Sequence, residues 1–163
     1  MAKFVPVPKF KPQPKGLAYL CGGGFDESII KLVISHEHLD PKEVTALLRR
    51  KPTTAFAKGD LSANGKIVRK FGRWVLETRW ISKVPFEKNL AAFLKKLPED
   101  ARVWRKLCSR YECSLKLLLR LRTWNRGGQI SPSAIREIAA RGLTLELDIY
   151  HDDDEKLWAD KKG

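Results

Sequence analysis

The spacing of apolar residues divides the chain into short strands and helices. Residues 28–35, "SIIKLVIS", form an apolar, β-branched run between turn residues, which predicts a buried strand. Residues 113–124, "CSLKLLLRLRTW", predict another strand, and residues 143–150, "LTLELDIY", alternate between apolar and polar positions as a half-covered strand does. The stretch from 52 to 82 predicts a short strand, a turn-rich loop and a long strand.

The long strand predicted in this stretch alternates in a way that separates two faces. Trp74 and Trp80 fall on one side, and Arg73 and Arg79 fall on the other. This alternation predicts an antiparallel strand with one packed face and one wetter face.

Two helices are predicted to begin with the same local chemistry. In "HLDPKEVTALL", Asp40 suits the N-cap, the proline after it suits the first helical position, and Glu43 completes a capping box. Leu39 and Val44 are placed to form a hydrophobic staple across this cap. The helix is predicted to end at "RRKP", where Pro52 prevents its continuation.

The second of these helices begins in "QISPSAIREIA". Ser131 suits the N-cap, and Ile130 with Ile135 is predicted to form the staple. Ile135, Ile138 and Ala139 are predicted to face the core, and Gly142 is predicted to end the helix.

Two more helices are predicted between the long strand and residue 113. Pro85 opens the first, and Pro98 separates it from the second, which carries acidic residues at its start. Both have apolar residues at helical spacing, namely Phe86, Leu90, Phe93, Leu94 and Leu97 in the first and Val103, Trp104, Leu107 and Cys108 in the second.

The predicted order of elements is β-α-β-β-α-α-β-α-β, which indicates an α+β domain with a mainly antiparallel sheet and helices packed on one face. Residues 1–16, rich in proline and lysine, predict an extended arm, residues 17–150 a single domain, and residues 151–163 a charged tail. The arm reads either as a solvated tail or as a basic segment that docks on a partner. The two similar helix starts fit either an internal duplication of strand-helix-strand units or convergence on the same cap chemistry.

Composition narrows the class of protein. At 163 residues and 43% hydrophobic content, the chain has material for a core without disulfide or metal staples. No apolar run is long enough to span a bilayer, and the start of the chain is a poor secretory signal. Three cysteines without CxxC spacing suit reduced thiols in the cytoplasm. The formal net charge of +13 favours polyanionic partners such as nucleic acid or an acidic protein.

Candidate catalytic or metal-binding groups are few. His36 and His38 flank Glu37, and His151 begins the run "HDDD", so a zinc or manganese site is one reading. Solvated loop residues are the preferred reading, because both clusters lie in connections or tails. Neither a GxSxG elbow nor a phosphate-binding glycine loop is present. We therefore predict no catalytic residues, no metal site and no cofactor, and a protein that is not an enzyme.

Basic residues on the predicted strands give a stronger pattern. Lys116, Arg120 and Arg122 are spaced by even numbers on one strand and therefore share a face. Arg69, Arg73 and Arg79 are predicted to lie on the long strand. These six residues are the predicted partner-binding surface, with the simpler alternative that they solvate the open sheet face beside acidic residues.

Three segments together resemble the bacterial family catalogued as domain of unknown function 4279. They are "LVISHEHLDPKEVTALLRRKPTTAFAKGD", "GRWVLET" and "ISPSAIREIAARGLTLELDIY". The shared landmarks are a strand, a Leu-Asp-Pro helix start, a Lys-Gly-Asp turn, a Gly-x-Trp strand and a last strand ending in Asp-Ile-Tyr. The resemblance covers most of residues 28–150 and implies no catalytic residues.

The sequence leads to two functional hypotheses. The leading one is a protein-binding module, by analogy an immunity or inhibitor protein of a bacterium or phage, that holds an acidic partner with its basic surface. The alternative is a nucleic-acid-binding protein that uses the same basic face. Neither hypothesis fixes the oligomeric state.

Overall fold

The structure is a computed structural model and describes residues 23–82, 84–122 and 126–151. Five strands and four helices follow one another in the predicted order. They are β1 (Glu27–His36), α1 (Pro41–Leu48), β2 (Thr54–Phe56), β3 (Gly72–Glu77), α2 (Phe86–Leu94), α3 (Ala101–Cys108), β4 (Glu112–Leu121), α4 (Pro132–Ala140) and β5 (Thr144–His151). The predicted arm at 1–16 and nearly all of the predicted tail lie outside the described residues.

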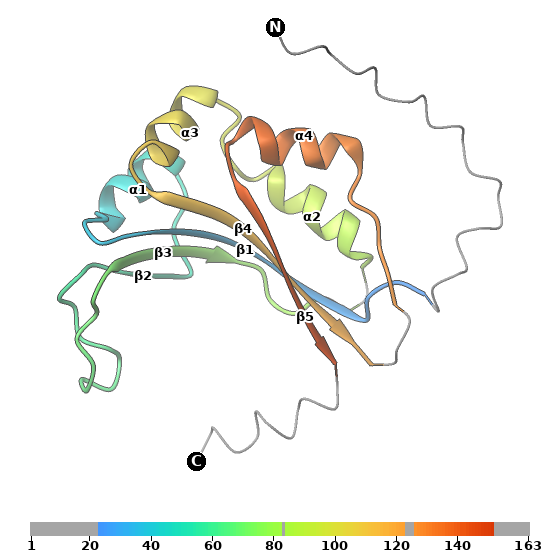
Figure 1. The fold of residues 1–163 in the computed structure, drawn as a ribbon, viewed down its shortest axis with the longest axis horizontal. Helices are drawn as coiled ribbons and strands as arrows, with labels where there is room; N and C mark the ends of the chain where they lie inside the picture. The colour runs from blue at the N-terminus through green and yellow to red at the C-terminus, as the bar shows by residue number, and fades with distance from the viewer. Residues whose placement is uncertain (1–22, 83, 123–125, 152–163) are drawn as a thin grey trace, which may run out of the picture.

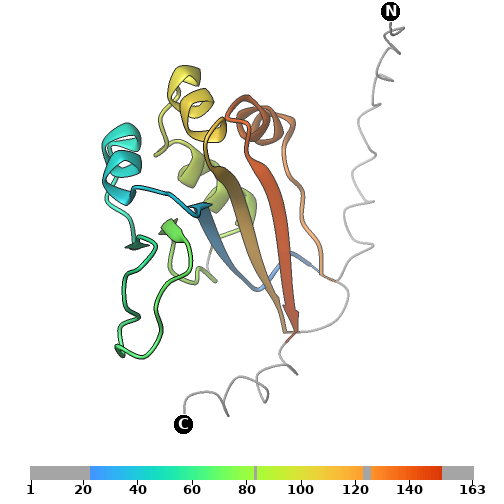
Figure 2. The ribbon, with the colours of Figure 1, turned by 60° about the vertical axis from the view of Figure 1, so that its left-hand side comes forward.

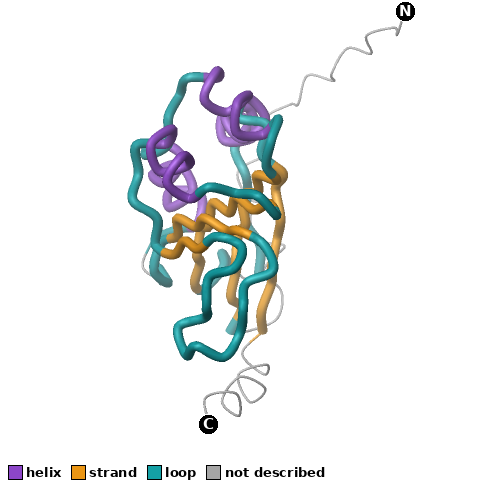
Figure 3. The backbone as a smooth tube through the Cα atoms, turned by 90° about the vertical axis from the view of Figure 1, so that its left-hand side faces the viewer, coloured by secondary structure: helices purple, strands orange, loops and turns teal. Residues whose placement is uncertain are grey.

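One sheet in the order β2-β3-β1-β4-β5 forms the lower layer of the molecule, and the helices form the upper layer (Figure 1). Three of the four strand pairs are antiparallel, and only β4 and β5 run parallel. The same two layers are seen in Figure 3, where the helices lie to one side of the strands. The predicted α+β class is confirmed.

The core lies between the sheet and the helices. On the central strand β1, Ile30, Leu32 and Ile34 point to the helix side and have no measurable exposure. The helix-side leucines of β4 and the apolar faces of α2 and α3 pack against them. Trp74 of β3 and Trp104 of α3 are also buried, and each indole N–H is satisfied, by the Thr45 hydroxyl at 3.0 Å and the Pro98 carbonyl at 2.7 Å respectively.

Helix α1 confirms the predicted N-cap but not the predicted capping box. The Asp40 carboxylate accepts from the Lys42 N–H at 2.8 Å, and Leu39 and Val44 are both buried. Glu43 instead lies 3.3 Å from Lys106 of α3. Just after this helix, it accepts from Arg110 at 2.6 Å and from the Tyr111 hydroxyl at 2.9 Å. A charged guanidinium and a phenol are stronger partners than one backbone amide, so Glu43 links two helices.

Helix α4 begins and ends as predicted, but its buried side is different. The Ser131 hydroxyl accepts from the Ala134 N–H at 3.2 Å, and Gly142, with a φ of 67°, completes a Schellman motif. Ala134 and Ile138 face the core, whereas Ile135 is 52% exposed and Ala139 is exposed too. The prediction that Ile135 and Ala139 face the core is therefore wrong, and Ala134 is buried in their place.

The two predicted strand-helix-strand units share strand direction but not adjacency. β4 and β5 are parallel neighbours joined through α4. β1 and β2, joined through α1, also run parallel, because both are antiparallel to β3, which lies between them. The units therefore have the same local cap chemistry and the same crossover direction, with one extra strand inserted in the first.

Strand β3 is shorter than the long strand that the alternation predicts. It ends at Glu77, and only Arg73 of the predicted arginines lies on it. Trp80 lies beyond this end and is 41% exposed, so the prediction that it packs with Trp74 is wrong. Its ring instead lies 4.9 Å from the guanidinium of Arg120.

Replacing Leu117 with Ala should lower the free energy of unfolding by about 2–5 kcal/mol, because this buried side chain would leave a cavity under the helices. Chemical denaturation measures the loss. Leu61→Ala, at a residue that is 63% exposed, serves as the matched control and should have an effect below about 0.5 kcal/mol. Equal losses in the two variants would contradict the assigned core.

Glu43 predicts an acid dependence of stability. Its hydrogen bonds from Arg110 and Tyr111 hold the pKa of this carboxyl below its usual range in the folded protein. Its contribution is therefore present above the unfolded pKa of about 4.3 and is lost as the pH falls through the lower folded pKa. Glu43→Gln should reduce stability near neutral pH and flatten the fall in stability below pH 4.3.

The control for this prediction is Glu99→Gln, since Glu99 forms no ion pair among the described residues. Unfolding curves between about pH 3 and 7 compare both variants with the wild type. A Glu43→Gln profile parallel to that of the wild type would show that this carboxyl does not link α1 to α3.

Candidate functional site

The face of the sheet opposite the helices carries charges that pair with one another. Lys31 of β1 and Lys116 of β4 lie side by side in the register of the sheet, with Glu77 of β3 beyond one and Glu146 of β5 beyond the other. The Lys31–Glu77 distance is 2.8 Å and the Lys116–Glu146 distance is 2.5 Å. This row across four strands therefore has no net charge.

A second group of paired charges lies where β1 starts and β4 ends. Glu27 accepts from Arg120 at 3.2 Å and from Arg122 at 2.9 Å. The neighbouring Asp26 carboxylate accepts from the Arg122 backbone N–H at 2.8 Å and lies 3.4 Å from Arg126. These contacts tie the two strand ends together, and the two carboxylates compensate all but one of the three arginine charges.

The six predicted partner-binding residues therefore do not form one basic face. Lys116, Arg120 and Arg122 share a face as predicted, but acidic neighbours on that face pair with them. Arg73 lies on the open face of β3. Arg69 precedes this strand and Arg79 follows it, which corrects their predicted place on a long strand.

A different surface combines unpaired cations with exposed apolar groups. It is the connection of residues 57–71 between β2 and β3, named here the projecting loop, which extends past the sheet away from the helices (Figure 2). Its two arms are joined by backbone hydrogen bonds, Gly59 to Arg69 at 2.9 Å and Ser62 to Ile67 at 2.8 Å. At its tip Gly65 adopts a φ of 70°, which suits glycine. The loop is thus a preformed hairpin-like element.

Leu61, Ile67 and Val68 of the projecting loop are unusually exposed, at 63%, 58% and 58%. Leu61 and Val68 form a β-bridge, which places them across from each other on the two arms. An ordered element that holds several large apolar side chains in water is typical of a binding surface.

Four cations surround these apolar residues. Lys66, Arg69, Lys70 and Arg73 have no acidic partner within 4.0 Å among the described residues, and the one acid of the loop, Asp60, accepts from the Ala57 N–H at 2.7 Å. The guanidinium of Arg69 lies 4.4 Å from the Phe56 ring, and that of Arg73 lies 5.1 Å from the Phe71 ring. Stacking on the rings orients both arginines without neutralising them.

The sequence contains a signal for this loop that its turn-rich composition alone does not bring out. Asn64-Gly65 is a strong hairpin turn signal, and apolar residues lie on both sides of it in "LSANGKIV". Because a two-stranded extension has no helix layer above it, those apolar residues remain in water. The sequence prediction therefore missed this exposed group, which consists of Leu61, Ile67 and Val68 together with Lys66 and Lys70.

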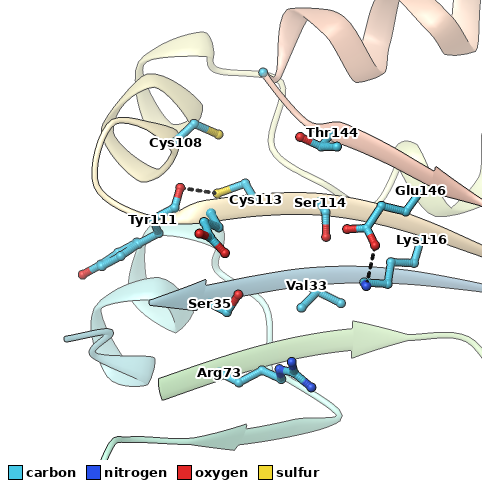
Figure 4. A pocket seen from close by; sticks show the side chains of 12 residues that line it. Val33, Ser35, Arg73, Cys108, Tyr111, Cys113, Ser114, Lys116, Thr144 and Glu146 are labelled. Carbon is cyan, nitrogen blue, oxygen red and sulfur yellow. Dashed lines mark hydrogen bonds and ion pairs between the residues drawn. The ribbon is translucent and has the colours of Figure 1, made fainter. Parts of the chain in front are cut away.

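A hollow of about 570 Å³ lies over the C-terminal end of β1 and the N-terminal ends of β4 and β5 (Figure 4). Its lining includes the hydroxyls of Ser35, Ser114 and Thr144, and Lys116 crosses it to Glu146. Cys113 lies at its rim beside Cys108, and this neighbour together with burial raises the pKa of the Cys113 thiol. No histidine lines the hollow, and its charged lining residues are Arg73, Glu112, Lys116 and Glu146.

His36 and His38 do not line this hollow, although the ring of His36 lies 5.8 Å from the ring of Tyr111, which does. The Nδ1 atom of His36 accepts from the His38 backbone N–H at 3.1 Å, and Glu37 pairs with Lys58. Among the residues that the structure describes, no group of three or more His, Cys, Asp or Glu side chains is placed to hold a metal ion. Residues 152–154 of the "HDDD" run lie outside that part of the chain.

In a comparison with known protein families, residues 26–152 match the family described as domain of unknown function (DUF4279). The chain belongs to this family. The match contains every described helix and strand, so the DUF4279 domain corresponds to the sheet with its four helices. No curated protein and no solved structure gave a significant match. The described part of the chain contains no helix with the length and apolar character needed to cross a membrane.

The pairing on the open face predicts that charge reversal at two basic residues changes the free energy of unfolding by different amounts. Lys116→Glu should destabilise the DUF4279 domain by about 1 kcal/mol or more, because it places a carboxylate against Glu146. Arg73→Glu should change stability by less than about 0.5 kcal/mol, because no acidic side chain of the described residues pairs with Arg73. Thermal and urea unfolding measure both, and equal effects would argue against the neutral row.

Proposed function

We propose that this protein is a non-enzymatic protein-binding module that holds an acidic partner with the projecting loop and the adjacent Arg73. The observation that carries the proposal is the preformed loop, on which Leu61, Ile67 and Val68 are exposed beside cations that have no acidic partner among the described residues. An immunity or inhibitor protein of a bacterium or phage, acting in the cytoplasm, would use a surface of this kind.

Charge and apolar contact have separate roles in this proposal. Lys66, Arg69 and Lys70 attract the acidic partner over a distance and raise the association rate. Ile67 and Val68 lose their water when the partner covers them, which slows dissociation. Because backbone hydrogen bonds already order the loop, binding does not have to order it at the cost of conformational entropy.

Nucleic-acid binding is the alternative for the same cations. Arginines held against aromatic rings also suit single-stranded nucleic acid, as Arg69 on Phe56 and Arg73 on Phe71 illustrate. However, Glu77 and Glu146 lie on the open sheet face, which a nucleic-acid strand would have to cross. Because these acids neutralise Lys31 and Lys116, the open face gives a phosphate backbone little attraction, and the arrangement favours a protein partner that contacts the projecting loop.

The charge-reversed variant Lys66→Glu/Arg69→Glu/Lys70→Glu tests the proposal. Affinity capture from the producing cells should retain an acidic protein on the wild type and lose it on this variant. With the captured partner, the reversal should slow association by about tenfold or more at low salt. Ile67→Ser/Val68→Ser should mainly speed dissociation, by about tenfold.

The matched control is Lys88→Glu/Lys95→Glu/Arg136→Glu, which makes the same change of charge on α2, at its end and on α4. This control should retain the partner at nearly the wild-type rate. Loss of binding in both triple variants would reduce the effect to net charge and contradict the assigned surface. Tight binding of single-stranded DNA or RNA, falling steeply as salt rises, would favour the nucleic-acid alternative.

A further inference from the structure

The edge strand β5 has an apolar face that the helices do not cover. Leu145, Leu147 and Ile149 lie on the helix side of the sheet, in register with three core leucines of β4. Those β4 leucines are at most 2% exposed, whereas Leu145 is 36% and Leu147 and Ile149 are each 56% exposed. In Figure 2 the start of β5 lies beneath α4, and its second half extends beyond the helix layer.

β5 is the last strand of the described sheet, and no described strand pairs with it on the outer side of Leu145, Leu147 and Ile149. An unpaired edge beside an apolar face is a site where another strand adds. On the opposite face β5 carries Glu146 and Asp148. A segment that fits this edge must therefore be extended, apolar on one side and basic on the other.

Residues 3–15 have this pattern. In an extended chain alternate residues share a side. The even positions are all apolar: Phe4, Pro6, Pro8, Phe10, Pro12 and Pro14. The odd positions hold all four lysines of this segment, Lys3, Lys9, Lys11 and Lys15. The other odd positions are Val5, Val7 and Gln13.

The prolines add a constraint on how this segment joins a sheet. Successive residues of a strand direct their backbone N–H groups to opposite edges, and all four prolines occupy even positions. The four missing N–H groups therefore all fall on one edge of this segment. On its other edge, the odd residues still have backbone N–H groups that can form hydrogen bonds with a neighbouring strand. Proline is tolerated in a sheet when its nitrogen faces solvent on an edge strand.

The described chain also starts near the C-terminal end of β5, where a parallel sixth strand would have to end. The Gly23 carbonyl accepts from the Gly127 N–H at 3.1 Å, and the Asp26 N–H donates to the Arg120 carbonyl at 3.0 Å. Arg120 pairs with Tyr150, close to the end of β5. Residues 16–22 can span about 23 Å at about 3.3 Å per residue, more than the roughly 14 Å of three strand spacings from β1 across β4 and β5 to the outer edge.

We propose that residues 3–15 lie along the outer edge of β5 as a sixth strand, parallel to it. The phenylalanine and proline side covers Leu145, Leu147 and Ile149, and the lysine side meets Glu146 and Asp148. A second copy of the chain fits this edge less well. Antiparallel pairing of two β5 strands that keeps their apolar sides together and centres on Leu147 sets Glu146 of each copy against Asp148 of the other.

Hydrogen exchange of the β5 amides in the full chain tests this proposal. Val7→Pro removes an N–H directed at β5, whereas the matched control Pro8→Val restores one on the solvent side. Val7→Pro should speed exchange of the outward β5 amides by about fivefold to tenfold, and Phe4→Ser/Phe10→Ser should do the same. Pro8→Val should exchange like the wild type.

The exchange is measured at protein concentrations where light scattering shows a single oligomeric state. Unprotected β5 amides in the wild type, or equal exchange in all variants, would overturn the proposal. Protection that rises with protein concentration and ignores the variants in residues 3–15 would assign the edge to a second copy instead and would also overturn it. Near-ultraviolet circular dichroism checks that every variant keeps its packed core.

Discussion

Burial of the helix-side residues of β1 is the constraint on which the rest of the structure depends. Ile30, Leu32 and Ile34 are shielded from water only if the helices lie together on one side of the sheet and β3 and β4 flank β1. All four helices are used for this purpose, so the other sheet face and both sheet edges are left without a cover in the described chain. Each uncovered region is then managed by local chemistry.

The distribution of charge follows from this one-sided core. Acidic residues on the open face and at the helix contacts pair with cations that would otherwise repel one another, as Lys31 and Lys116 would at neighbouring positions. The formal excess of +13 must therefore be located where acids are few. The projecting loop is one such place, and its cations remain available to a partner.

Local signals in the sequence predict most of the fold. Cap residues such as Asp40 and Ser131 act within a few residues of chain, so they locate helix starts without knowledge of the tertiary structure. The apolar, β-branched run of β1 and the side-chain alternation of β5 likewise predict strands from local sequence. The errors concern choices made by distant residues: Glu43 bonds Tyr111 across 68 positions instead of its own helix start, and Ala134 displaces Ile135 from the core.

The proposed binding surface was predicted less well for the same reason. Spacing places Lys116 and Arg120 on one face, but only strand order reveals that Glu146 and Glu27 lie beside them. Conversely, the apolar residues around Asn64-Gly65 look like ordinary strand residues until the fold shows that nothing covers them. Strand order and the extent of the helix layer are the two facts that composition and periodicity do not contain.

Photo-crosslinking in the producing cells tests most directly whether the projecting loop is the contact surface. A photoreactive residue replaces Ile67 in one variant and Arg136, on the helix layer, in another. The account predicts that an acidic protein is crosslinked from position 67 and not from position 136. Crosslinks to a partner from position 136 with none from position 67 would contradict it.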